Sequence, residues 1–300
     1  MNSWNSYIQE FRSYLKIERS LSPNTIEGYI EDMFKLQQYM EMEHPGVSPK
    51  KVETQHIRSF LKYITDLGLA ITSQNRILSG IKSFYKYLLL DDQIDQSPAD
   101  KIETARAGRK LPDTLSNDEV ESLLAAIDRS KPEGERNIAI IEVLYGCGLR
   151  VSELVNLKIS NIYFNDDFIR VTGKGDKQRL VPLGGMAKKH ILIYMNEIRI
   201  HLKIQKGHED FLFLNRRGKQ LTRVMIFTII KTLAEKAGIH KNISPHTLRH
   251  SFATELIQRG ADLRAIQDML GHESITTTEI YTHLNQNDLL DTIIQYHPRS

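Results

Sequence analysis

Two side chains near the C-terminal end of this sequence have the types and the spacing needed to bind an anion. His246 and Arg249 are three residues apart in HTLRHSF, which begins a predicted helix, so both project from one face of it. A guanidinium matches two phosphate oxygens at once, and the amino end of a helix adds positive potential. The pair therefore predicts a phosphate site, although an isolated HxxR pair is more often an ordinary surface feature.

Two other basic residues become relevant beside this pair. Arg150 follows a glycine-rich helix end in GCGLRVSEL, where the next helix start could hold its side chain inward; a solvated arginine or an ion pair with Glu153 is the alternative. Lys174 lies between two glycines in GKGDK, a predicted hairpin tip, where a basic turn residue is the ordinary interpretation. A flexible ammonium group there can also donate a proton to a leaving oxygen.

A tyrosine in the last motif is the candidate nucleophile. Tyr281 lies nine residues after His272 in LGHESITTTEIYTH, on a threonine-rich segment that could present it to a phosphate. A phenol has an ordinary pKa of about 10, so it attacks near neutral pH only with a base or with stabilisation of the developing charge. By itself, such a tyrosine is usually a buried packing residue.

The order and surroundings of these residues resemble the active site of the tyrosine recombinase family of the phage integrase type, most closely its Xer branch of XerC-like and XerD-like enzymes. The resemblance covers nearly the whole chain, through LSPNTIEGYIEDMFKL, NRILSGIKSFYKYL and a linker ending in LP. The residues that carry it are Arg150, Lys174, His246, Arg249, His272 and Tyr281.

The resemblance implies a chemical role for each of these groups. Tyr281 would attack the scissile phosphate, leaving a 3′-phosphotyrosyl bond and a free 5′-hydroxyl. His246 would act as the base or orient the phenol. Arg150 and Arg249 would hold the non-bridging oxygens and stabilise the pentavalent transition state.

The remaining site residues would complete the transfer. Lys174 would protonate the departing 5′-oxygen, His272 would bind a phosphate oxygen, and Glu153 would support the site or form a structural salt bridge. A 5′-hydroxyl of another strand can then reseal the DNA, so the scheme needs neither a metal nor any other cofactor. The sequence agrees, since it has no Walker glycine loop, no cysteine cluster and no carboxylates spaced as in a two-metal nuclease.

Helical periodicity and the resemblance together predict the elements that position these residues. We expect a mostly α-helical, two-domain, C-shaped DNA clamp. Residues 1–96 would form a four-helix SAM-like core-binding domain, 97–112 a basic linker, and 113–300 a catalytic domain with a small antiparallel β-sheet and a tail helix.

Local signals place the individual elements. Ser22 and Pro23 begin a helix that ends near Met42, and Ser116 with Glu119 forms a capping box that begins a helix through Ile127. The alternating segment 160–183 predicts a β-hairpin. The other predicted helices cover about 54–67, 72–90, 135–145, 186–204, 222–237, 247–259 and 262–270.

One helix of the first domain has a polar side suited to a DNA major groove. It lies opposite the apolar residues Ile77, Ile81, Phe84 and Leu88. A plain solvated face is the equal alternative. The candidate DNA-binding residues are Ser73, Gln74, Arg76, Lys82 and Lys86.

Composition sets only broad limits. The net charge of +3 is too small to indicate nucleic acid by itself. One cysteine, Cys147, excludes an intramolecular disulfide, and no apolar run has the length of a signal peptide or a membrane span. We therefore expect a cytoplasmic protein without a membrane partner.

The tail after Tyr281 bears on assembly. Leu289, Leu290, Ile293 and Ile294 have helical spacing and need a cover. The resemblance implies docking into a neighbouring protomer of a tetramer on two double-stranded DNA sites, and intramolecular packing is the alternative.

The resemblance also implies a biological role. Recombination through a Holliday junction would resolve chromosome dimers at cell division, with a paralogous recombinase and a septal DNA translocase as partners. The alternatives are a mobile-element integrase, a non-catalytic DNA-binding protein on the same fold, and a type IB topoisomerase. The short segment before the core domain favours Xer over an integrase, the complete set of six residues argues against a non-catalytic protein, and the tail disfavours a topoisomerase.

Overall fold

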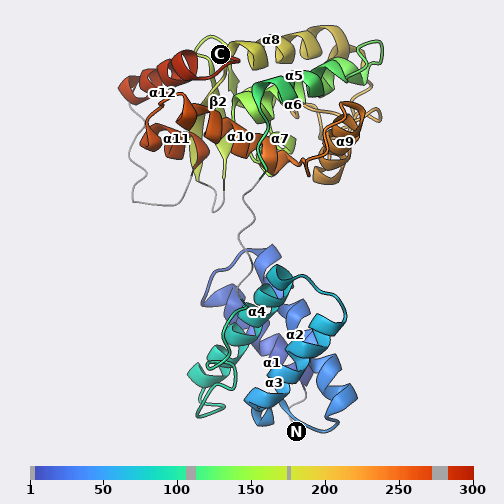
Figure 1. Ribbon diagram of the computed structural model, residues 1–300, viewed down its shortest axis with the longest axis vertical. Helices are drawn as coiled ribbons and strands as arrows, with labels where there is room; N and C mark the ends of the chain where they lie inside the picture. Colours follow the sequence, from blue (N-terminus) through green and yellow to red (C-terminus); the bar gives the residue numbers. More distant parts are fainter. Residues whose placement is uncertain (1–3, 106–112, 174–176, 272–282) are drawn as a thin grey trace. The chain divides into compact units, whose positions relative to one another are not determined.

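The protein is described by a computed structural model that covers residues 4–105, 113–173, 177–271 and 283–300, with the backbone alone at 283–287. The chain divides into two compact units, Met1–Lys110 and Leu111–Ser300. Figure 1 shows the helices and strands of both units, and each unit has its own hydrophobic core.

The first unit is the predicted group of four helices. They are α1 (Trp4–Ile17), α2 (Pro23–Glu43), α3 (Thr54–Asp66) and α4 (Ile71–Leu90), with a short 3₁₀ turn, η1, at Pro49–Lys51. The predicted start of α2 is confirmed, because the Ser22 hydroxyl accepts a hydrogen bond from the Thr25 amide at 3.3 Å. The predicted break after α3 falls at Gly68, whose φ of +81° suits glycine.

The first unit extends into the segment predicted as a linker. Ala99 and Ile102 are buried in the core of this unit, although the sequence around them has no helical periodicity. The Asn75 side chain also bonds both the amide and the carbonyl of Ala105. Residues 97–105 therefore belong to the folded unit, because two isolated apolar side chains suffice to hold an irregular segment.

The second unit contains one three-stranded antiparallel sheet in the order β1-β2-β3. Its strands are β1 (Ile162–Tyr163), β2 (Phe168–Thr172) and β3 (Gln178–Pro182). Ile169 pairs with Ile162 on one side and with Val181 on the other. The predicted hairpin is confirmed.

Helices make up most of the rest of the second unit (Figure 1). One prediction is wrong in extent: the helix expected at 186–204 ends as an α-helix at Ile193 and continues as a π turn and a 3₁₀ turn. The elements are α5 (Asn117–Ala125), α6 (Glu133–Gly146), α7 (Val151–Val155), η2 (Ile159–Asn161), α8 (Gly185–Ile193), η4 (Tyr194–Ile198), η5 (Arg199–His201), α9 (Arg223–Lys236), α10 (Pro245–Gln258), α11 (Leu263–Leu270) and α12 (His283–Tyr296).

Helix α6 is the central element of the second unit. It is buried from Ile138 to Gly146 and contacts both α8 and α10. Just after its end, Gly148 has a φ of +59°, and a Cβ there would lie 2.6 Å from the Phe252 ring of α10. Only glycine permits this approach, which brings the segment before α7 against α10.

The tail helix packs on its own chain. Leu289 and Ile293 of α12 are buried in a cluster with Phe252 and Met269, whereas Ile294 is 60% exposed. The intramolecular alternative for the apolar stripe is therefore the arrangement that this chain adopts. None of the helices in the described part of the chain is long and apolar enough to cross a membrane.

Candidate active site

Arg150 and Glu153 meet at the start of α7. The Arg150 amide donates to Glu153 Oε2 at 2.8 Å, so the carboxylate caps the helix, and Arg150 Nη1 donates to Oε1 at 2.9 Å. The Glu153 side chain is only 2% exposed, against 40% for Arg150. This geometry turns the carboxylate inward and leaves the guanidinium accessible.

Arg249 reaches the same place from α10. That helix begins at Pro245, two residues before the predicted start, and the Ser244 hydroxyl caps it by accepting from the Thr247 amide. Arg249 is buried, and its Nη1 donates to the Gly148 carbonyl at 2.5 Å. The same nitrogen lies 3.9 Å from Glu153 Oε2.

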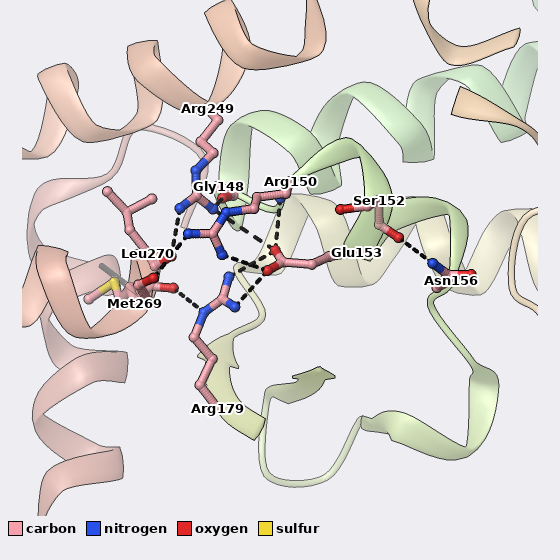
Figure 2. A network of polar contacts seen from close by, with 10 residues as sticks. Gly148, Arg150, Ser152, Glu153, Asn156, Arg179, Arg249, Met269 and Leu270 are labelled. Atoms are coloured by element: carbon pink, nitrogen blue, oxygen red, sulfur yellow. Dashed lines mark hydrogen bonds and ion pairs between the residues drawn. The ribbon is translucent and has the colours of Figure 1, made fainter. Parts of the chain in front are cut away.

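A third arginine, absent from the residues singled out in the sequence, completes the group. Arg179 of β3 is buried and donates from Nη1 and Nη2 to the two oxygens of Glu153 at 2.7 and 2.9 Å (Figure 2). Its signal was its strand position, since Arg179 shares an inward face with the fully buried Val181. A charged residue there must be paired. We call Arg150, Arg179 and Arg249 around Glu153 the arginine cluster.

The cluster also holds the C-terminal end of α11. The last carbonyls of a helix have no amide partner within it and carry partial negative charge. Three successive carbonyls each accept from a different arginine: Met269 from Arg179 Nε at 2.8 Å, Leu270 from Arg249 Nη2 at 2.6 Å, and Gly271 from Arg150 Nη2 at 3.0 Å. Figure 2 shows the arginines converging on this turn.

The electrostatics of the cluster leave room for an anion. Three guanidinium groups and one carboxylate have a net formal charge of +2. Burial raises the pKa of Glu153, but bonds and charge from Arg179, then Arg150, outweigh it and lower that pKa overall. Burial first, and the nearby Arg150 charge second, lower the pKa of Arg249 to about 10. An anionic ligand would compensate this excess of positive charge.

Of the other four predicted catalytic residues, one lies within the described part of the chain. His246 lies on α10, one turn before Arg249, and is exposed. Lys174, His272 and Tyr281 lie outside the described residues. The structure thus brings together Arg150, Arg249 and Glu153. Within the described residues, no group of three or more His, Cys, Asp or Glu side chains is arranged to hold a metal ion.

The candidate DNA-binding residues of α4 differ in whether their side chains have partners within the protein. Arg76 binds both oxygens of Asp32 at 2.7 Å, and that carboxylate is fully buried in α2. Gln74 donates to the Leu69 carbonyl at 2.8 Å. Both side chains therefore have structural partners. Lys86 is exposed, and Ser73 and Lys82 are half-buried.

Comparisons with known proteins show the family of this chain. Residues 113–288 match the phage integrase family, and residues 8–91 match the phage integrase N-terminal SAM-like domain. The chain is 42% identical over 296 residues to tyrosine recombinase XerD of Listeria monocytogenes, covering 99% of this chain and 100% of the relative. It is 43% identical to tyrosine recombinase XerD of Oceanobacillus iheyensis, covering 98% of each chain.

A solved structure of a recombinase is similar to this chain in fold and sequence. The crystal structure of XerH site-specific recombinase bound to palindromic difH substrate, a post-cleavage complex, is 26% identical, with a TM-score of 0.71 over 95% of this chain and 83% of that one. Together with the two matched domains and the arginine cluster, these likenesses identify the chain as a member of the phage integrase family: it is a Xer-like tyrosine recombinase, a site-specific DNA recombinase.

Proposed function

We propose that this enzyme cleaves DNA through a 3′-phosphotyrosyl intermediate and exchanges strands through a Holliday junction. The observation that carries the proposal is the arginine cluster, in which the partly exposed Arg150, the buried Arg249 and Arg179 surround one carboxylate and retain excess positive charge. A phosphodiester carries one negative charge and its pentavalent state carries two, so the excess suits the transition state better than the ground state.

The arginines keep enough donors for this task. A guanidinium has five N–H groups. The hydrogen bonds described above use two N–H groups of the Arg150 side chain and two of Arg249, so each retains three donors. A phosphate can therefore bind without displacing the bonds that orient these side chains.

The bond changes follow from the remaining residues, whose roles rest on the family resemblance. The Tyr281 oxygen forms a bond to phosphorus while the bond from phosphorus to the 5′-oxygen breaks. His246 accepts or orients the phenolic proton, Lys174 supplies a proton to the departing 5′-oxygen, and His272 donates to a phosphate oxygen. A 5′-hydroxyl then reverses the same steps and reseals the strand.

The biological role that we propose, from the resemblance to the Xer branch, is resolution of chromosome dimers at cell division. Relatives named tyrosine recombinase XerD match this chain over nearly their whole length. The working assembly would be a tetramer on two DNA sites, with a paralogous recombinase and a septal DNA translocase as partners. Lys82 and Lys86 of α4 would contribute phosphate contacts to the grip on the duplex.

A nicked suicide duplex tests the chemistry. A site is first selected by binding from a pool of random duplexes, and its scissile strand is then nicked so that cleavage traps the enzyme on the DNA. The wild type should form a covalent protein-DNA band on a denaturing gel, whereas Tyr281→Phe should bind the duplex and form none. A band that persists in Tyr281→Phe would refute the nucleophile, and binding without a band in either protein would refute the cleavage step.

A further inference from the structure

Arg179 has fewer free donors than the other two arginines. Its side chain is 7% exposed, as is that of Arg249, against 40% for Arg150. Three of its five donors are already used, two by Glu153 and one by the Met269 carbonyl. Its stem also packs against Gly271, where a Cβ would lie 3.0 Å from Arg179 Cδ. Arg179 is therefore poorly placed to bind a phosphate.

Its partner, Glu153, is shared by the whole cluster. Each carboxylate oxygen accepts one bond from Arg179 and one from Arg150, through a guanidinium nitrogen for Oε1 and the backbone amide for Oε2. Arg249 Nη1 lies just beyond hydrogen-bond range, 3.9 Å from Oε2. If Arg179 were absent, Arg249 would be the nearest cation able to take its place on the carboxylate.

The geometry points to Arg179 as a positioning residue, which saturates Glu153 so that Arg249 and Arg150 stay available to the scissile phosphate. The inference deepens the proposed function and rests on it, since it concerns the same phosphate site. Without Arg179, the net charge of the cluster would fall from +2 to +1. The Glu153 carboxylate would then have free lone pairs beside Arg249 and would compete with the phosphate for that guanidinium.

The bond to Met269 gives Arg179 a second positioning contact. Met269, Leu270 and Gly271 each accept from one arginine, so the end of α11 and the cluster hold one another in register. His272 follows Gly271 directly in the sequence. Loss of Arg179 would remove the first of these bonds. The end of α11 would then be held only by Arg249 and Arg150, the same groups that must bind phosphate.

A double variant tests this role, with the cleavage rate at saturating protein and the duplex affinity measured separately. Arg179→Met removes the charge but keeps an unbranched stem, and should lower the single-turnover rate of covalent adduct formation by about 10- to 100-fold at saturating protein, with little change in duplex affinity. Adding Glu153→Gln removes the competing carboxylate and restores the net charge of +2. We expect Arg179→Met/Glu153→Gln to cleave faster than Arg179→Met alone.

Two further variants keep the test decisive. Arg136→Met also deletes a buried guanidinium of this unit, 6% exposed and about three turns before the end of α6, and should leave the cleavage rate near that of the wild type. Arg179→Lys can still neutralise Glu153, so it should cleave faster than Arg179→Met. It replaces Arg179→Met if that variant shows no cooperative thermal unfolding transition and is therefore not folded.

The outcomes distinguish this inference from the proposed function. If the wild type itself forms no Tyr281 adduct, the proposed function fails. If the wild type forms the adduct but Arg179→Met matches its rate, the positioning role is refuted. It is equally refuted if adding Glu153→Gln slows Arg179→Met further, because an unpaired Glu153 carboxylate would then not be what competes with the phosphate.

Discussion

Two buried ion clusters of the second unit have opposite charge balances. The arginine cluster sets three guanidinium groups around one carboxylate. Near the C-terminus, Arg299 instead lies between Glu142 of α6 and Glu121 of α5, which we call the tail cluster. Its single cation faces two carboxylates and is satisfied within the chain.

The pKa directions express the same difference. Burial and a neighbouring arginine lower the pKa of Arg249 to about 10. Burial also acts to lower the pKa of Arg299, but Glu142 and Glu121 outweigh it and raise that pKa above its ordinary value. A buried cation with an excess of carboxylate is a structural device, whereas buried cations with too little carboxylate indicate a site for an anionic ligand.

The largest expected effect comes from Arg249. Arg249→Met removes a guanidinium that we propose binds the scissile phosphate, and should lower the rate of covalent adduct formation by about 10²- to 10³-fold. The measurement is single-turnover cleavage of the suicide duplex, with the matched change Arg299→Met as the control. A rate for Arg249→Met close to that of the wild type would mean that the charge excess serves no catalytic purpose.

The same substitution in the tail cluster should act on stability. Arg299→Met leaves Glu142, which is 1% exposed, without its cation, and should lower the free energy of unfolding by about 3 kcal/mol. Urea unfolding of the full chain measures this. Adding Glu142→Gln should recover part of the loss; an unchanged unfolding midpoint in Arg299→Met would contradict the structural role of this pair.

A smaller effect should appear as pH dependence. His297 lies between the rings of Tyr145 and Phe252, at 5.0 and 5.3 Å between centroids. Burial, and then the charge of Arg299, lower its pKa to about 3. Between that value and its ordinary pKa of 6.5 the unfolded chain binds more protons than the folded one, so stability falls as the pH is lowered.

From pH 7 to pH 5 this histidine should account for a loss of about 2 kcal/mol. Urea unfolding at both pH values, with wild type and His297→Gln compared, isolates the contribution as a difference in slope. Glu153 adds nothing in this range, because its pKa is lowered and its stabilisation is lost only as the pH falls through that lowered value. Equal slopes in the two proteins would show that His297 does not titrate as stated.

The sequence was a good guide wherever the controlling interactions are local. Ser22 and Pro23 begin α2, and Ser116 with Glu119 begins α5, because a cap is formed by residues three positions apart. The hairpin followed from period-two alternation. The helix expected at 186–204 was wrong past Ile193, where apolar periodicity alone does not distinguish an α-helix from a π turn.

Arg76 shows where such reasoning stopped. Its place on the polar side of α4 favoured DNA contact, but its guanidinium binds Asp32, 44 residues earlier. From the sequence alone, an aspartate on a helix is expected to be solvated. In the structure, the packing of α2 against α4 buries it. The polar face and the ion pair are therefore indistinguishable in the sequence.

By itself, the sequence determined the family and the order of the elements, because motifs and caps depend on neighbours along the chain, and it supplied the candidates for the residues that carry the chemistry. Only the tertiary structure decided which charges share a partner. Arg179 meets Glu153 across 26 residues and Met269 across 90, and α12 covers its apolar stripe on its own chain. Such pairings depend on how distant elements pack, and burial then makes each unpaired charge too costly to leave unsatisfied.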